Sequence, residues 1–172
     1  IAVGLINAVE PKIDDQVVDK CWTNVAAVKA RISAELERSN IAVYNEALVF
    51  ELPNAPVLEF KIIGFRVGTH QCVGNITTSV YNFSSIQLGS LGYTKNVYTI
   101  EGKHVMWTRS ALHSANDTLD IVAMSSAQES IDNLISNIFA SRREDAVSDF
   151  RVNFPQDKPM TISEIRQKTS EQ

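Results

Sequence analysis

His70 and Cys72 form a His-x-Cys pair beside an expected turn, which resembles the start of a zinc-ligand pattern. Zinc needs three or four ligands, and no second cluster of histidines and cysteines follows in the sequence. His104 and His113 do not have the i, i+4 spacing that places two ligands on one face of a helix. We therefore predict no metal site and no cofactor.

Motifs of covalent catalysis and of phosphate binding are absent from the sequence. It contains no Gly-x-Ser-x-Gly elbow, no Ser-x-x-Lys, no Gly-x-Gly-x-x-Gly and no Walker loop. An enzyme would have to assemble its site from scattered residues such as Glu101, His104 and His113. That remains an alternative, but we predict that the protein is not an enzyme and assign no catalytic residue.

Cys21 and Cys72 are the two cysteines of the chain. Cys21 lies on the apolar stripe of an expected helix and Cys72 on the apolar side of an expected strand, so both face the core if that helix covers that strand. A disulfide between them would close a loop of about 50 residues and contribute on the order of 2–4 kcal/mol. Two buried thiols are the alternative. We favour a structural disulfide, because a chain that begins at Ile1 without an initiator Met also fits an exported protein after signal-peptide removal.

Two helices and several strands would position these cysteines. Residues 118–143 have the apolar spacing of a long amphipathic helix, and residues 16–39 have that of a second, with Asp14 or Asp15 as its cap. The stripe of the long helix comprises Ala127, Ile131, Leu134 and Ile138, widened by Ile135 and Phe139, and that of the second comprises Cys21, Val25, Val28, Ile32 and Leu36.

Alternating apolar residues and turn signals predict the strands. In residues 57–67 the core side comprises Leu58, Phe60 and Ile62, and in residues 72–82 it comprises Cys72, Ile76 and Val80. A later hairpin would pair residues 93–100 with 104–111 through Glu101-Gly102-Lys103, burying Val105 and Trp107. Two shorter strands are predicted at residues 41–44 and 48–52.

This order predicts an α+β fold, with an antiparallel sheet of about four or five strands covered on one face by two long helices. Residues 1–15 would form an amino-terminal arm, 16–143 the globular domain and 144–172 a polar tail. The tail is poor in apolar residues, so we expect it to be extended or held by a partner, with one or two helical turns at 163–168. A formal net charge of -4 argues against a nucleic-acid partner.

Five segments together resemble a family of small bacterial periplasmic or envelope proteins whose fold is similar to the amino-terminal domain of TolB and to CsgG-like proteins. The segments are VKARISAELERSNIAVYNE, LEFKIIGFRV, CVGNITTSVYN, VMWTRSAL and ESIDNLISNIFASRRE. They span about residues 25–143, and the family's positions are occupied by Leu36, Asn40, Ile41, Val43, Cys72, Trp107, Ile131, Asp132, Leu134, Ile135 and Asn137. The chain departs from the family pattern in its long 81–100 connection and in its polar tail.

The resemblance implies a non-catalytic, exported subunit of an envelope complex of the secretion-channel or flagellar-ring type. Its partners would be other protein subunits, and an open sheet edge would offer a place for strand addition. Homo-oligomers also fit this interpretation, as does a periplasmic location or one associated with the outer membrane. The alternatives are a small-ligand or lipid-binding module, which would use space between sheet and helices, and the enzyme considered above.

Overall fold

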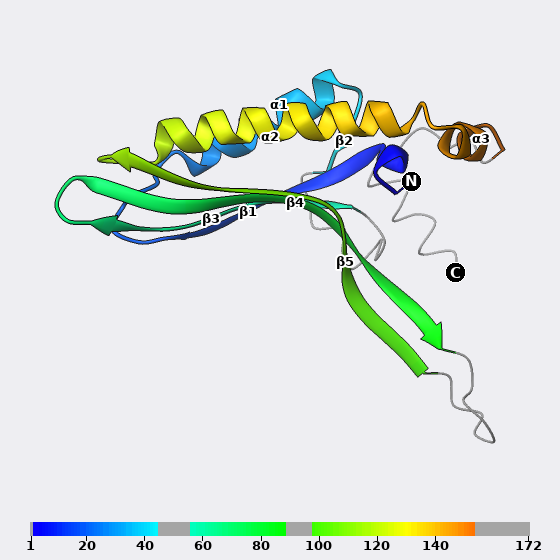
Figure 1. The fold of residues 1–172 in the computed structure, drawn as a ribbon, viewed down its shortest axis with the longest axis horizontal. Helices are drawn as coiled ribbons and strands as arrows, with labels where there is room; N and C mark the ends of the chain where they lie inside the picture. Colours follow the sequence, from blue (N-terminus) through cyan, green and yellow to red (C-terminus); the bar gives the residue numbers. More distant parts are fainter. Residues whose placement is uncertain (1, 45–55, 89–97, 154–172) are drawn as a thin grey trace.

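The computed structural model describes residues 2–44, 56–88 and 98–153 (Figure 1). In chain order its elements are the 3-10 helix η1 (Ala2–Leu5), β1 (Ala8–Val17), α1 (Val25–Arg38), β2 (Ala42–Val43), β3 (Val57–Val67), β4 (Gln71–Leu88), β5 (Tyr98–Asn116), α2 (Asp120–Ser141) and α3 (Asp145–Asn153).

The sheet has five strands in the order β2-β1-β3-β4-β5. β1 runs parallel to both of its neighbours, whereas β3, β4 and β5 pair antiparallel. The sheet is therefore mixed and not purely antiparallel. The difference comes from residues 8–17, which the sequence places largely in an arm and which instead form a strand inside the sheet.

The two long helices lie side by side over one face of the sheet, as predicted for this α+β fold (Figure 1). The core between the two layers is closed by buried residues of the predicted stripes, among them Ile32, Leu36, Leu58, Phe60, Ile62, Ile76, Val80, Ile131, Leu134 and Ile138. Burial of this apolar surface is the main driving force for the packing of the layers. We call the helix-covered face of the sheet the inner face and the opposite one the outer face.

Helix α1 begins at Val25 and not at Gln16. The residues proposed as its cap, Asp14 and Asp15, belong to β1 instead. The intervening loop turns at Asp19 and Lys20, whose φ angles of 59° and 55° are incompatible with a right-handed helix. Cys21 thus lies in this loop, although its spacing matches the apolar stripe of the helix that follows.

Strands β4 and β5 form one long hairpin. Their register runs from Gln71 opposite Asn116 to Leu88 opposite Tyr98, and past the end of β3 the pair continues as a two-stranded arm (Figure 1). The predicted turn at residues 101–103 is wrong, because these residues are part of β5. Val105, predicted to be buried, is 48% exposed. The predicted strand at 48–52, the start of the 93–100 strand and the helical turns at 163–168 lie outside the described residues.

The chain after α2 continues as helix α3, where the sequence predicts an extended tail. Val147 of α3 is fully buried, and Gly4 of η1 approaches it closely. Arg142 supports the same junction by donating hydrogen bonds to the backbone oxygens of Gly4 and Ile6, at 3.3 and 2.7 Å. The first residues of the predicted tail are therefore held by the chain's own amino-terminal segment.

Asp120 joins the starts of α1 and α2. Its carboxylate accepts hydrogen bonds from the backbone N–H and the hydroxyl of Thr23, both at 2.7 Å, and from the backbone N–H of Asn24 at 3.3 Å. Although burial of the carboxyl acts in the opposite direction, these hydrogen bonds lower the pKa of Asp120. The ionised side chain thereby fixes the entry of α1 against the first turn of α2.

Candidate functional site

Cys21 and Cys72 are joined by a disulfide, with their Cα atoms 5.7 Å apart. The bond connects the loop before α1 to the start of β4. Leu119 reaches the same junction, because its backbone N–H donates to the carbonyl of Cys21 at 2.6 Å. The predicted pairing is thus present, and it ties together three segments that are distant in sequence.

Arg66 strengthens this junction from the end of β3. Its guanidinium donates to the carbonyl oxygens of Asp117 at 2.9 Å, Asp19 at 3.3 Å and Thr69 at 3.5 Å. One cation thus satisfies carbonyl groups of three loops that would otherwise need water. Together with the disulfide, this arrangement serves architecture and presents no reactive group.

The three histidines considered as metal ligands or catalytic residues lie in different places and do not form one site. His70 lies in the β3–β4 turn near Asp117, His104 is exposed on β5, and the ring of His113 contacts the hydroxyl of Ser126 on α2 at 3.1 Å. His104 and His113 are separated along one strand by roughly 30 Å. Within the described part of the chain, no three His, Cys, Asp or Glu residues are grouped as a metal site.

The outer face carries exposed apolar side chains toward the β3–β4 turn. Phe65 is 54% exposed and Leu112 is 76% exposed, and both side chains project away from the helices. We define the outer patch by these two residues and three further exposed ones, Ile63 and Val67 on the same face of β3 as Phe65, and Val18, whose backbone bonds to Gly64. Asn75 of β4 lies between Ile63 and Leu112. Apolar side chains gathered on one exposed face are typical of interaction surfaces.

The residue types along β3 already contain a signal for this patch. The outer-facing positions of the strand change from Glu59 and Lys61 to Ile63, Phe65 and Val67. Alternation alone assigns one face of a strand to the core and the other to solvent, and so overlooks this change. A strand whose solvent side becomes apolar halfway along indicates a second contact surface.

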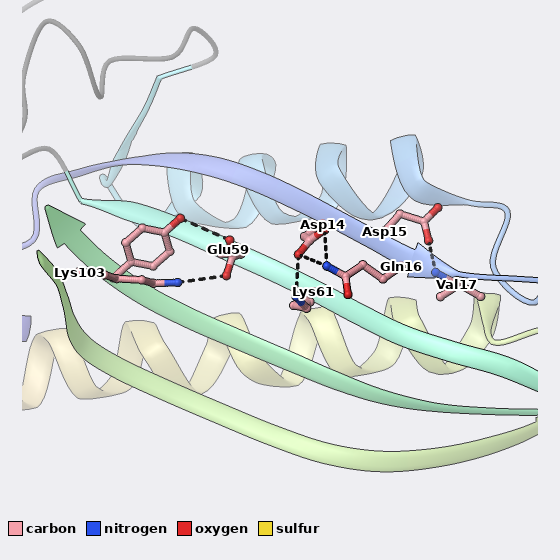
Figure 2. Close-up of polar contacts among 8 residues, drawn as sticks. Asp14, Asp15, Gln16, Val17, Glu59, Lys61 and Lys103 are labelled. Carbon is pink, nitrogen blue, oxygen red and sulfur yellow. Dashed lines mark hydrogen bonds and ion pairs between the residues drawn. The ribbon is translucent and has the colours of Figure 1, made fainter.

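Beside the outer patch, the same face carries a charged band on β1, β3 and β5 (Figure 2). Lys61 pairs with Asp14 at 2.9 Å, and Lys103 pairs with Glu59 at 3.3 Å. Lys103 also lies over the ring of Tyr81, 3.5 Å from its centroid, while the Tyr81 hydroxyl donates to Glu59 at 3.3 Å. These contacts fix the outer face at the point where the arm leaves the sheet.

The surroundings of Tyr81 disfavour its ionisation. Burial, together with the nearby carboxylate of Glu59, raises the pKa of Tyr81 from 10.0 to about 12. The folded state therefore binds the phenolic proton more tightly than the unfolded chain does. Stability gained in this way is complete below about pH 10 and is lost as the pH rises to about 12.

We expect Glu59→Gln to lower the pKa of Tyr81, because the substitution removes the negative charge beside the phenol but leaves its burial unchanged. Tyrosinate absorbance during an alkaline titration measures this shift, and Tyr81→Phe identifies which part of the signal belongs to Tyr81. Identical titration curves for the wild type and Glu59→Gln would show that the carboxylate does not act on this phenol.

The two edges of the sheet differ in their ability to accept another strand. At the β1 edge, Pro11 has no N–H, and the N–H of Val17 is taken by the carboxylate of Asp15 at 3.0 Å. Within the described residues, β5 has no partner strand on its other side. Natural sheets often protect an edge with proline. Among the described residues the β1 edge has such a proline, whereas residues 107–116 of β5 contain none.

A groove of about 700 Å3 runs between α1 and β1. It has apolar walls that include Ile13, Val25 and Phe83, and it carries Lys12 and Lys29. The groove is partly open to solvent, in contrast to the enclosed pockets that bury most of a small ligand.

No protein-family model matches the chain, and a comparison with curated proteins gives no match. Among solved structures it is similar to a PelC variant dodecamer from Paraburkholderia phytofirmans, at 14% identity over 75% of this chain and 87% of that one, with a TM-score of 0.45. A minor lipoprotein from Acinetobacter baumannii is 11% identical over 77% of this chain and 93% of its own, with a TM-score of 0.37. Rare lipoprotein B from Shewanella oneidensis is 13% identical over 86% of this chain and 99% of its own, with a TM-score of 0.21. Likenesses this weak carry no functional argument.

Proposed function

We propose that this protein is an exported, non-catalytic accessory subunit that docks into a larger assembly of the bacterial envelope. The observation that carries the proposal is the outer patch, an exposed apolar surface on the helix-free face of the sheet. Leaving such side chains in water costs free energy that a partner would recover, at about 25 cal/mol per Å2 of apolar surface buried. The partner we propose is another protein subunit and not a nucleic acid, since the chain carries a formal net charge of -4.

The disulfide supports the exported part of the proposal. Such bonds persist in oxidising compartments such as the periplasm and are rare in the reducing cytosol. The resemblance of residues 25–143 to envelope proteins agrees with this location. Among the helices within the described residues, none is long and apolar enough to cross a membrane.

The sequence suggests that a partner holds the polar tail, but the structure gives less support to docking through this segment. Its first part, α3, packs on the chain's own amino-terminal segment through Val147 and therefore needs no partner to hold it. The docking proposal consequently depends on the outer face of the sheet and not on the tail.

We expect Phe65→Ser to release the protein from its complex, because an aromatic side chain at the centre of an interface commonly contributes about 2 kcal/mol or more, or roughly thirty-fold in affinity. The measurement is the sedimentation of the protein in gently solubilised envelopes of cells that produce it. Ile121→Ser is the matched control, since Ile121 is 85% exposed but lies on α2, away from the outer face.

The wild type and Ile121→Ser should sediment in an assembly larger than a dimer, and Phe65→Ser as the free protein. Equal sedimentation of all three in a large assembly would contradict docking through the outer patch. A wild type that sediments alone would contradict the subunit role itself.

A second candidate function is the binding of an anionic amphiphile, favoured by the apolar groove with Lys12 and Lys29. Titration with a fluorescent fatty acid tests it, and Lys29→Glu should weaken binding if the groove is the site. An unchanged affinity in this variant would exclude the groove.

A further inference from the structure

From the free edge of β5 we infer that two copies of this chain pair antiparallel, about a two-fold axis at Leu112. The inference rests on the proposed docking role of the outer surface and names one of its partners, a second copy. It combines three features of the described residues: an edge that can accept a strand, a regular stretch long enough to hold one, and a sequence that complements itself.

The available edge belongs to β5. The β1 edge lacks a donor at Pro11, and Asp15 occupies the N–H of Val17. Its first two residues, Ala8 and Val9, are already paired with β2. Head-to-tail addition of β5 to the β1 edge of a next copy is therefore disfavoured. Pairing of β5 with β5 uses the same surface on both copies, which closes as a two-fold dimer and does not extend into a fibre.

The regular part of this edge is the segment from Trp107 to Asn116. The register with β4 shifts between Val80 and Tyr81, where Met106 is an extra residue on β5. Beyond the shift, the ladder runs without interruption from Trp107 opposite Val80 to Asn116 opposite Gln71. This stretch is roughly 30 Å long and is comparable to a long strand of a globular protein.

The side chains of the segment match those of the second copy best when Leu112 lies opposite Leu112 of the second copy. On the outer face this register places Ser110 opposite Ser114 of the second copy and Thr108 opposite Asn116 of the second copy. Both are pairs of short polar side chains that can hydrogen-bond. The one charged residue of the segment, Arg109, is bound to Glu129 on α2 of its own chain and lies opposite an alanine, Ala115. No like charges meet across the axis.

Other registers are less favourable. An axis at Arg109 would oppose two guanidinium groups, which is destabilising in a cross-strand pair. An axis at Ser110 or Ser114 would place Leu112 against a polar residue, Thr108 or Asn116. Among the axes that do not oppose two charges, the one at Leu112 buries this 76% exposed side chain against an apolar partner, its own copy. It also places the outer patches of the two copies on the same side of the joined sheet.

The first test is the mass of the purified wild-type protein in solution at several concentrations, where we expect a dimer. Leu112→Cys should be linked between the two chains by a short thiol-specific cross-linker, because opposite residues of an antiparallel pair have Cβ atoms about 4.5–5.5 Å apart. Thr108→Cys is the matched control: it is also exposed on the outer side of β5, but its partner is Asn116 of the second copy, so it should remain largely unlinked. The variant carrying both Thr108→Cys and Asn116→Cys should be linked.

Leu112→Lys should weaken the dimer at least tenfold by opposing two like charges on the axis, and its unchanged circular dichroism would show that the fold is intact. A wild type that is monomeric at all concentrations would overturn the inference. So would a dimer in which Leu112→Cys stays unlinked or Thr108→Cys links equally well. If the protein is a monomer in solution but sediments in a large envelope assembly, the pairing is wrong and the proposed function is supported. If it is a dimer but does not sediment in such an assembly, the pairing is supported and the proposed function is wrong.

Discussion

Replacing Leu119 with alanine is expected to lower the free energy of unfolding by roughly 3–5 kcal/mol. Leu119 is fully buried at the start of α2 and packs on two glycines that face each other in neighbouring strands, Gly64 and Gly74. Its removal leaves a cavity between the helix and the sheet that rigid strands cannot fill. Urea unfolding followed by circular dichroism measures the change. Ile121→Ala, at an 85% exposed position two residues later, should change the stability by less than about 0.5 kcal/mol.

The two glycines provide a sharper test of the same contact. A Cβ at position 74 would lie 2.7 Å from Leu119 Cδ1, so Gly74→Ala alone should destabilise the protein by about 1–3 kcal/mol. In the double variant with Leu119→Ala, the added methyl group has room, and the loss should be smaller than the sum of the two single losses. Strict additivity would show that Leu119 does not fill this space.

Removal of the disulfide by the double substitution Cys21→Ala and Cys72→Ala is expected to cost about 2–4 kcal/mol. The bond joins residues separated by 51 positions, so its loss frees a long loop in the unfolded chain. Urea unfolding of the two proteins, with and without a reductant, measures the effect.

Reductant should destabilise the wild type by a similar amount and leave the double variant unchanged. If reductant does not alter the unfolding midpoint of the wild type, the disulfide contributes no stability.

The strands with clean alternation could be predicted from the sequence. β3 has the predicted bounds, Val57–Val67, because Leu58, Phe60 and Ile62 alternate with polar or outer-facing residues and a Gly-containing turn follows. β5 could not be predicted in the same way. Glu101-Gly102-Lys103 has the composition of a turn, but its pairing with residues 83–85 of β4 overrides that local preference.

β1 could not be predicted either, because its residue types also disfavour a strand when they are considered without their neighbours in space. Proline and paired carboxylates argue against a central strand, yet an edge strand tolerates them. Pro11 lies where the edge needs no donor, Asp14 is neutralised by Lys61, and Asp15 accepts the N–H of Val17. These roles depend on neighbours that are distant in sequence, so composition alone could not reveal them.

The cysteine pairing could be anticipated, but for a partly incorrect reason. The spacing assigns Cys21 to the stripe of α1, whereas a loop that turns at Asp19 and Lys20 brings it to Cys72. The residue types at these two positions, Asp and Lys, do not predict positive φ angles. The outer patch is visible in the sequence as Ile63, Phe65 and Val67, but which face of β3 remains uncovered depends on where both helices pack.

The position of β1 also governs the order in which the molecule can assemble. This strand is made early, yet Glu10 pairs with Val57, roughly fifty residues later, and along most of its length it has no other strand beside it. The part of β1 from Glu10 to Val17 must therefore wait for β3 before it gains a backbone partner, since β2 pairs only with Ala8 and Val9, and such long-range pairing slows folding. A chain that folds slowly stays unfolded for longer, and such a delay suits the export that we propose.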